Sequence, residues 1–313
     1  MPSVETDARR EHGQMIVIFA LCLVGMVGMT GLVLDGGDTF LQRRDLQNVA
    51  DASAMAGAYA YAMTTQADAT TARVVQMAMS NGLYNGVSSS AAAVDVQVTP
   101  IGSGATVAVS VTKPHRNTFS AILGFASWDV SATATALIGG PNGVFGLMPI
   151  IINQRTFAAF GFGPDSERGF DEPGNGTVDV PQDATSFNWS VFCTASGNSC
   201  NGNSQTVAAL IVGHGETIKI TLDDRIGPLN AGAHTTLFDN MALWLGTEFP
   251  VAIVDDAGGL QGFAIFHLTG TLGGSTKQLR GYFVTGNNSD FVFDPDVTGG
   301  TSAFGAYVVR LIN

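Results

Sequence analysis

Charged residues are scarce in this chain, and positively charged residues are the scarcest. Only 13% of the 313 residues are Asp, Glu, Lys or Arg, about half of the roughly 25% that is usual in globular proteins. Lys and Arg together number 14 against 26 Asp and Glu, and the formal net charge is -12. Nucleic-acid binding needs a basic surface, so this balance argues against DNA or RNA as a partner. The same negative balance argues against electrostatic binding to anionic lipid.

The sequence also lacks the signatures of common catalytic sites. It contains no Gly-x-Ser-x-Gly elbow, no Walker loop and no His-Glu-x-x-His helix. Of the five histidines, His214 and His234 lie in glycine-containing stretches, where we expect exposed loops. We therefore predict no catalytic residue, no cofactor and no metal ligand.

One acidic stretch leaves a structural calcium ion open as an alternative. Residues 171–179 are rich in Asp, Asn and Gly, as calcium loops are. Pro173, however, stands where the third ligand would be, and the terminal bidentate Glu is missing. We assign no metal ligand there.

Cysteine is sparse, with three residues in the chain. Cys22 lies in an apolar run, where it is expected to act as a small apolar residue. Cys193 and Cys200 flank the polar segment Thr-Ala-Ser-Gly-Asn-Ser. We predict a disulfide between them in an oxidising compartment, with free thiols as the alternative. A metal site would need further Cys or His ligands nearby.

The most informative stretch is a long uncharged apolar run near the N-terminus, Met15–Leu34. About twenty apolar residues is the length that an α-helix needs to cross a bilayer. A buried core helix of this length would carry a polar face, and a cleaved signal peptide would have a shorter apolar region with a cleavage site just after it. We therefore predict an uncleaved single-pass anchor in the cytoplasmic membrane, with membrane lipid as its partner.

Charge alone does not orient this anchor, because Arg9 and Arg10 flank one side and Arg43 and Arg44 the other. The N-terminal tail is too short to be a domain, and the predicted disulfide needs an oxidising compartment. We therefore place the N-terminus in the cytoplasm and the body outside.

The sequence around the anchor resembles a known family. Gly-Gln precedes the apolar run, Leu-Asp-Gly-Gly follows it, and Arg-Arg-x-Leu-Gln-Asn-x-Ala-Asp-Ala comes next. This pattern is similar to the N-terminal segment of TadE/TadG-type proteins of the tight-adherence (Flp) pilus-assembly group. The resemblance implies an envelope protein linked to pilus biogenesis or surface attachment, without an enzymatic activity. The matching motif residues are Gly13, Gln14, Asp35, Gly36, Arg43, Arg44, Leu46, Gln47, Asn48, Ala50, Asp51 and Ala52.

Small residues recur at helical spacing on this helix, which favours close contact with another helix. We therefore expect helix packing with other Tad-type or pilus components, and a homo-oligomer is a further expectation. The alternative is that glycine is simply common in membrane helices. The residues of this expected face are Gly25, Gly28, Gly31, Ala50, Ala54, Gly57 and Ala58.

The rest of the chain predicts an α+β fold that is mainly β toward the C-terminus. A helix is predicted over Thr65–Asn81. Alternating valines on either side of a glycine-rich turn predict a hairpin, and Trp128–Ile138 a third strand. Residues 207–212 and 235–245 fit a helix or a strand. The expected divisions are a cytoplasmic leader (1–13), the anchor and Tad-like helix (14–63), an α+β stalk (64–138), a linker (139–145) and a β-rich domain (146–313). A sandwich is one arrangement open to the last of these.

Taken together, these features predict a non-enzymatic envelope protein that assembles or anchors a surface appendage. A second reading is a pilin-like filament subunit released by cleavage after Gly13. The fifth residue after Gly13 is Ile18, where prepilins carry Glu. A third reading is an envelope hydrolase or ligand-binding head, for which the sequence offers no signature.

Overall fold

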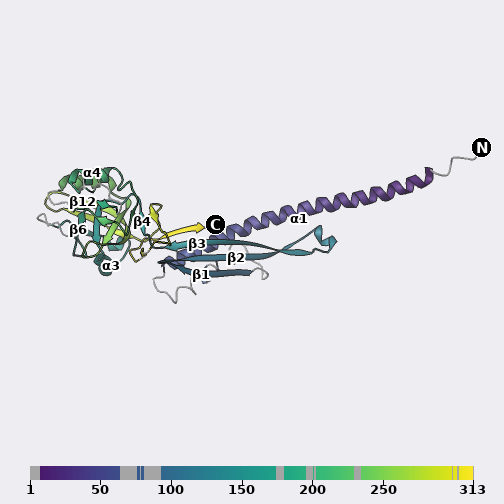
Figure 1. The fold of residues 1–313 in the computed structure, drawn as a ribbon, viewed down its shortest axis with the longest axis horizontal. Coiled ribbons are helices and arrows are strands. Elements are labelled where there is room, and N and C mark those ends of the chain that lie inside the picture. The colour runs from purple at the N-terminus through teal and green to yellow at the C-terminus, as the bar shows by residue number, and fades with distance from the viewer. Residues whose placement is uncertain are drawn as a thin grey trace, which may run out of the picture.

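The computed structural model of the chain is elongated, with a long helix at one end and a rounded head at the other (Figure 1). It describes residues 8–63, 76–77, 79–80, 93–173, 180–194, 200, 202–228, 234–297, 299–301 and 303–312. The helix predicted over residues 65–81 lies largely outside the described residues.

Helix α1 (Ala8–Met63) runs without a break for 56 residues. At 1.5 Å per residue it is about 84 Å long. Its first half is apolar and its second half is rich in alanine, the residue with the highest helix propensity. The helix continues through Gly36 and Gly37, where Thr39 Oγ1 donates to the Asp35 carbonyl at 2.8 Å.

The second half of α1 lies on one face of a four-stranded antiparallel sheet (Figure 1). Alternate valines of the predicted hairpin, Val107, Val109 and Val111, point into this contact and are buried. The opposite face carries Ser and Thr side chains, as the period of two predicts. The sheet order is β1 (Ala93–Ile101), β2 (Gly104–Arg116), β3 (Ser127–Gly139) and β15 (Val308–Ile312).

The end of the chain returns to this stalk sheet, which the sequence did not indicate. Strand β15 pairs with β3, with Leu311 opposite Ala136. The stretch predicted as a linker is also built into the fold, because Gly139 ends β3 and residues 140–144 are buried. The Asn142 side chain donates to the Asp294 carbonyl and accepts from the Asp294 N–H. Residues 139–144 therefore do not form an exposed connection, since they pack between the stalk and the head, whereas Phe145 is exposed.

The head contains a six-stranded mixed sheet in the order β6-β13-β12-β11-β5-β7. The pair of β5 and β11 is parallel, and the other neighbours are antiparallel. The strands are β5 (Ile150–Asn153), β6 (Arg168–Asp171), β7 (Phe187–Trp189), β11 (Glu248–Val254), β12 (Leu260–Leu272) and β13 (Gln278–Val284).

The two faces of this sheet bury different cores. Helices α4 (Ser204–Val212) and α5 (Thr235–Met241) pack on one face, which settles the two ambiguous segments as helical. The other face shares a core with a three-stranded sheet of β14 (Phe291–Val292), β4 (Gly143–Val144) and β9 (Ile220–Thr221). The six-stranded sheet therefore packs against the three-stranded sheet on one face and against helices α4 and α5 on the other. The fold is α+β with a mainly β C-terminal region, as predicted.

Short elements complete the described part. They are η1 (Ser120–Leu123), α3 (Arg155–Ala159), η2 (Pro164–Ser166), η3 (Ala242–Trp244) and the pair β8 (Phe192–Cys193) and β10 (Arg225–Ile226).

Candidate functional site: the apolar helix and its clamp on the stalk

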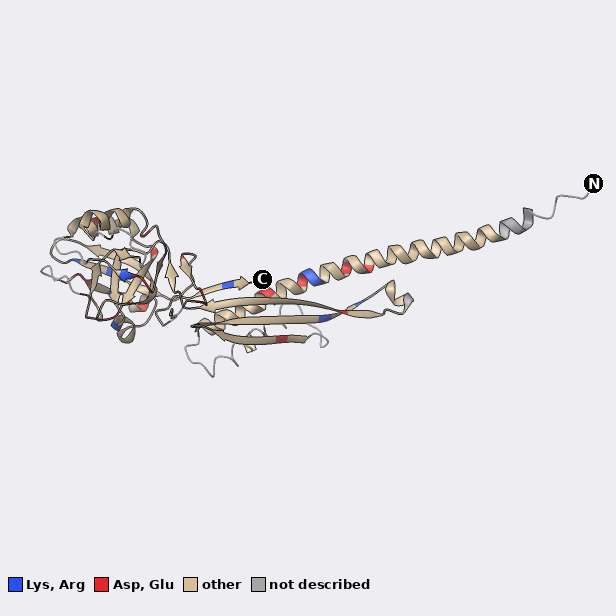
Figure 2. Ribbon diagram, in the orientation of Figure 1, with Lys and Arg blue, Asp and Glu red and all other residues tan. Residues whose placement is uncertain are grey.

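The first half of α1 presents apolar side chains on every side. The large apolar residues of Met15–Leu34 are all exposed, and Cys22 is exposed among them. No charged residue interrupts this stretch, which Figure 2 shows in tan. The segment is long and apolar enough to cross a membrane. An apolar surface of this extent needs lipid or protein to cover it.

Asp35, the first charged residue after the apolar segment, clamps the helix to the stalk. Its carboxylate is 4% exposed and accepts the backbone N–H groups of Thr118 at 3.0 Å, Phe119 at 3.0 Å and Ser120 at 2.6 Å. The hydrogen bond from Ser120, supported by those from its neighbours, lowers the pKa of Asp35, although burial acts in the opposite direction. The sequence marked Asp35 as a motif residue, and the structure gives it this physical role.

A second set of polar contacts lies one helical turn further along. The Trp128 indole N–H donates to Thr39 Oγ1 at 3.0 Å, and the His115 ring stacks on Trp128. His115 Nδ1 lies 2.6 Å from Gln42 Oε1, and the Gln42 amide reaches the Lys113 carbonyl. These contacts fix the rotation of α1 relative to strands β2 and β3.

The remaining motif residues divide between two faces of α1. Leu46 and Ala50 are buried against the sheet, and Gln47 donates to the Thr133 carbonyl at 3.0 Å and to Asp51 Oδ1 at 2.8 Å. The opposite face is exposed and carries Arg43, Arg44, Asn48 and Ala52. The Gln14 side chain is also exposed, and the Gly36 position is half-buried. Some motif residues therefore pack against the stalk sheet, and the others are exposed on the opposite face of α1.

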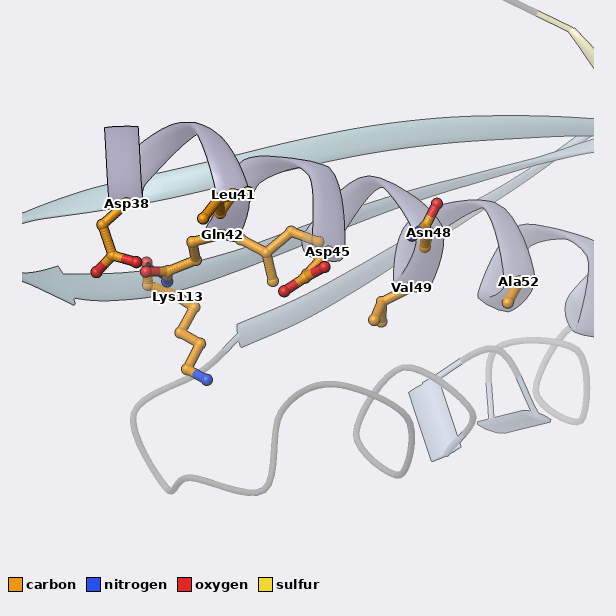
Figure 3. Close-up of a pocket in the computed structure, with 9 residues that line it drawn as sticks. Asp38, Leu41, Gln42, Asp45, Asn48, Val49, Ala52 and Lys113 are labelled. Carbon is orange, nitrogen blue, oxygen red and sulfur yellow. Dashed lines mark hydrogen bonds between the residues drawn. The ribbon is translucent and has the colours of Figure 1, made fainter. Parts of the chain in front are cut away.

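An open groove of about 930 Å³ borders the exposed motif face. Figure 3 shows Asp38, Gln42 and Lys113 gathered at one end of it, and Asn48 and Ala52 at the other. Its walls come from α1 and β2. The groove is shallow and partly apolar, which suits a protein segment better than a small molecule.

The small residues predicted to contact another helix mostly contact their own chain. Ala50, Ala54 and Ala58 are fully buried against the stalk sheet, and Gly57 is buried beside them. Gly31 lies under Phe119, where an added Cβ would come within 2.4 Å of the Phe119 Cβ. Gly25 and Gly28 alone of the set have open space beside them, with nothing within 4 Å of an added Cβ.

In the head, Cys193 and Cys200 form a disulfide, with their Cα atoms 5.4 Å apart. Among the described residues, no group of three or more His, Cys, Asp or Glu side chains is arranged to hold a metal ion. Within the stretch considered for calcium, residues 174–179 lie outside the described residues. Asp171 accepts from Gln278, and Glu172 pairs with His234.

His234 is not the exposed loop residue that the sequence predicted. Its side chain is buried, and Nδ1 contacts a Glu172 oxygen. Lys277 Nζ lies 3.9 Å from the other oxygen of Glu172. These partners are far apart in the sequence, so no local pattern could have joined them. His214 is exposed as predicted, beside the Trp244 ring.

The described geometry is that of a protein with one N-terminal apolar helix suited to membrane anchoring, joined to a stalk and a head. The sequence model of the Tad family, described as Flp pilus-assembly TadE/G-like, matches residues 13–72. This match confirms the resemblance carried by the motif, over about a fifth of the chain. Comparisons with curated proteins and with solved structures gave no match.

Proposed function

We propose that this chain is a non-enzymatic, membrane-anchored envelope protein that acts in the assembly or anchoring of a Tad/Flp-type pilus or surface appendage. The observation that carries the proposal is the continuity of α1. One unbroken helix leads from an exposed apolar half into the core of the stalk, within the Tad-like segment. A force or contact at the membrane is therefore transmitted directly to the stalk.

The proposed organisation follows the sequence-based divisions. Residues 1–13 form a cytoplasmic leader, 14–63 the anchor and Tad-like helix, 64–138 the stalk and 146–313 the head, with β15 returning to the stalk and residues 139–144 packed between the two. The body lies outside the cytoplasmic membrane, where the disulfide Cys193–Cys200 is stable.

The orientation is tested with a single added cysteine on the stalk. Ser131 is exposed on β3, so Ser131→Cys in a Cys22→Ala background places a reactive thiol there without disturbing the core. We expect a membrane-impermeant maleimide to label it in intact spheroplasts. Labelling that occurs only after lysis contradicts an outside body.

The partners proposed are other Tad-type or pilus components, reached through the exposed motif face of α1. The test compares a deletion strain complemented with the wild type, with Asn48→Arg/Ala52→Arg, or with Ser131→Arg, a control at an exposed position on β3 that should keep both piliation and attachment. We expect the double variant to stay in the membrane fraction while pili and surface attachment are lost. Normal piliation in the deletion strain contradicts the function itself.

The alternative is a filament-forming subunit released after cleavage following Gly13. The all-round apolar surface of Met15–Leu34 favours it, because like helices can cover such a surface as well as lipid can. The intact mass of the native protein separates the two. A mass near 32.5 kDa supports the permanent anchor, and loss of residues 1–13 supports the filament subunit.

A further inference from the structure

The loop between β2 and β3, residues 117–126, exposes apolar side chains. Ile122 is 82% exposed, Phe125 64% and Phe119 37%. The loop contains no Asp, Glu, Lys or Arg. A cluster of exposed apolar side chains in a loop without charge marks a contact surface.

This loop lies beside the end of the apolar half of α1, on the N-terminal side of Asp35. Phe119 and Ile122 form an apolar pocket of about 210 Å³ with Leu23, Val24, Val27 and Gly28. Figure 1 shows the tip of the β2–β3 hairpin running along α1 away from the head. At 1.5 Å per residue, Val27 lies roughly 10 Å before Leu34, where the apolar segment ends. If Met15–Leu34 spans a hydrocarbon core of about 30 Å, the loop reaches about a third of the way into it.

Most backbone N–H groups of the loop have partners within the protein. In lipid, backbone polar groups must find partners inside the protein. The Asp35 carboxylate accepts the N–H groups of residues 118, 119 and 120. Within the loop, the N–H groups of residues 117, 122, 124 and 125 donate to backbone carbonyls. The Asn117 side chain donates to the Phe125 carbonyl.

The base of the loop carries the side chains that favour a membrane interface. Trp128 lies at the start of β3 and donates to Thr39, just beyond the apolar segment. Arg116 is exposed at the facing strand end, and Lys113 lies on the same strand, further from the loop. Trp and long cationic side chains are typical of the boundary between hydrocarbon and water. Moving away from the apolar tip, the strands carry Arg116 first, then Trp128 opposite His115, and then Lys113. The long Arg116 side chain can extend toward the water, so this arrangement fits the outer boundary of a bilayer.

We propose that the loop of residues 117–126 inserts into the outer leaflet beside α1, with Phe119, Ile122 and Phe125 among the lipid acyl chains. The protein then contacts the lipid with two adjoining segments, which restricts the tilt of the stalk relative to the membrane. This inference rests on the proposed function in two respects, because it takes Met15–Leu34 as the membrane-spanning segment and places the body outside.

The test uses the full chain with Cys22→Ala and one added cysteine, reconstituted in phosphatidylcholine–phosphatidylglycerol vesicles. Cys193 and Cys200 are joined in a disulfide and do not react. A polarity-sensitive nitrobenzoxadiazole probe is attached at Ile122→Cys, with Ile18→Cys as the control inside the anchor and Ser131→Cys as the control on the stalk. All three positions are exposed, so the substitutions remove no buried side chain.

We expect the probe at position 122 to behave like the probe at position 18. Brominated acyl chains should quench both, and iodide in the water should quench each several-fold less than the probe at position 131. If position 122 is quenched by iodide while position 18 is not, the loop stays in water and the inference is wrong, although the anchor stands. If position 122 is shielded from both quenchers, protein covers it, which also overturns the inference. If iodide quenches the probe at position 18, Met15–Leu34 does not lie in the membrane. That result contradicts the proposed function as well as this inference.

Discussion

The backbone N–H of Ser120 donates to the carboxylate of Asp35 at 2.6 Å, across 85 positions of the sequence. This contact joins the end of the apolar helix segment to the loop between β2 and β3. The same carboxylate accepts two further backbone N–H groups, from Thr118 and Phe119. One family-motif residue thus couples the anchor to the stalk.

The first prediction concerns the charge of Asp35. Its pKa is lowered from the ordinary value of 3.8, chiefly by the Ser120 N–H, so the ionised form stabilises the fold. A lowered pKa means that this stabilisation is complete above 3.8 and is lost as the pH falls through the lower folded value. We expect Asp35→Asn to reduce the melting temperature in detergent micelles near pH 7, and the difference from the wild type to shrink below pH 3.8.

The control for this change is Asp45→Asn, because Asp45 is exposed on α1. We expect it to leave the melting temperature unchanged across the same pH range. A pH-independent difference between the wild type and Asp35→Asn would show that the carboxylate charge does not hold the loop.

The second prediction concerns the close approach of Gly31 and Phe119. A Cβ at position 31 would lie 2.4 Å from the Phe119 Cβ, so Gly31→Ala must displace the loop. Overpacking of this kind typically costs about 1–3 kcal/mol. We expect faster hydrogen exchange in residues 117–126. Gly28→Ala is the matched control, since its Cβ meets nothing within 4 Å, and equal exchange in the two variants would contradict the contact.

The third prediction separates a helix face used by the fold from one used by a partner. Ala54 is fully buried against the stalk sheet, and Ala52 is exposed on the opposite side of α1. We expect Ala54→Leu to lower the free energy of unfolding by about 1–3 kcal/mol, because the added atoms have no space. Ala52→Leu should leave it nearly unchanged in urea unfolding of the purified protein. If Ala54→Leu is neutral, the small residues are free to serve another helix, as the sequence first predicted.

Local patterns predicted the parts of the fold that depend on neighbouring residues. The alternation of Val107, Val109 and Val111 predicted the hairpin, because a strand on a one-sided core must alternate. The apolar length of Met15–Leu34 likewise predicted the helix. For Val207–Val212 the period was ambiguous, but Asn203 was an available signal. Its side chain accepts the Thr206 N–H and caps α4.

Contacts between distant residues could not be predicted in this way. The pairing of β15 with β3 depends on chain segments about 170 residues apart, and only the folded sheet brings Leu311 opposite Ala136. The glycines at 139 and 140 are typical of a linker, yet here they allow close backbone packing, with Gly140 against Thr301. The clamp at Asp35 was visible only as a motif position, since its partners are backbone N–H groups that carry no side-chain signature.

The last prediction concerns Glu216, which is half-buried in the head. Burial raises the pKa of its carboxyl group above the ordinary value of 4.5, although the hydrogen bond from the Phe192 N–H to Glu216 Oε1 acts in the opposite direction. A raised pKa means that the folded state prefers the protonated acid. The stability that this group contributes is therefore present below pH 4.5 and is lost as the pH rises through the folded value.

Glu216→Gln keeps an acceptor for the Phe192 N–H and removes the ionisation, so we expect it to unfold at higher temperature than the wild type at pH 7. The two proteins should converge as the pH falls toward 4.5, because the wild-type carboxyl group is then protonated. Glu216→Ala removes the acceptor as well and should lose about 1 kcal/mol, the typical net value of one hydrogen bond. Melting curves of the three proteins between pH 4 and 8 measure both effects. A Glu216→Gln protein that is less stable than the wild type at pH 7 would show that the ionised carboxylate has a favourable partner in the head.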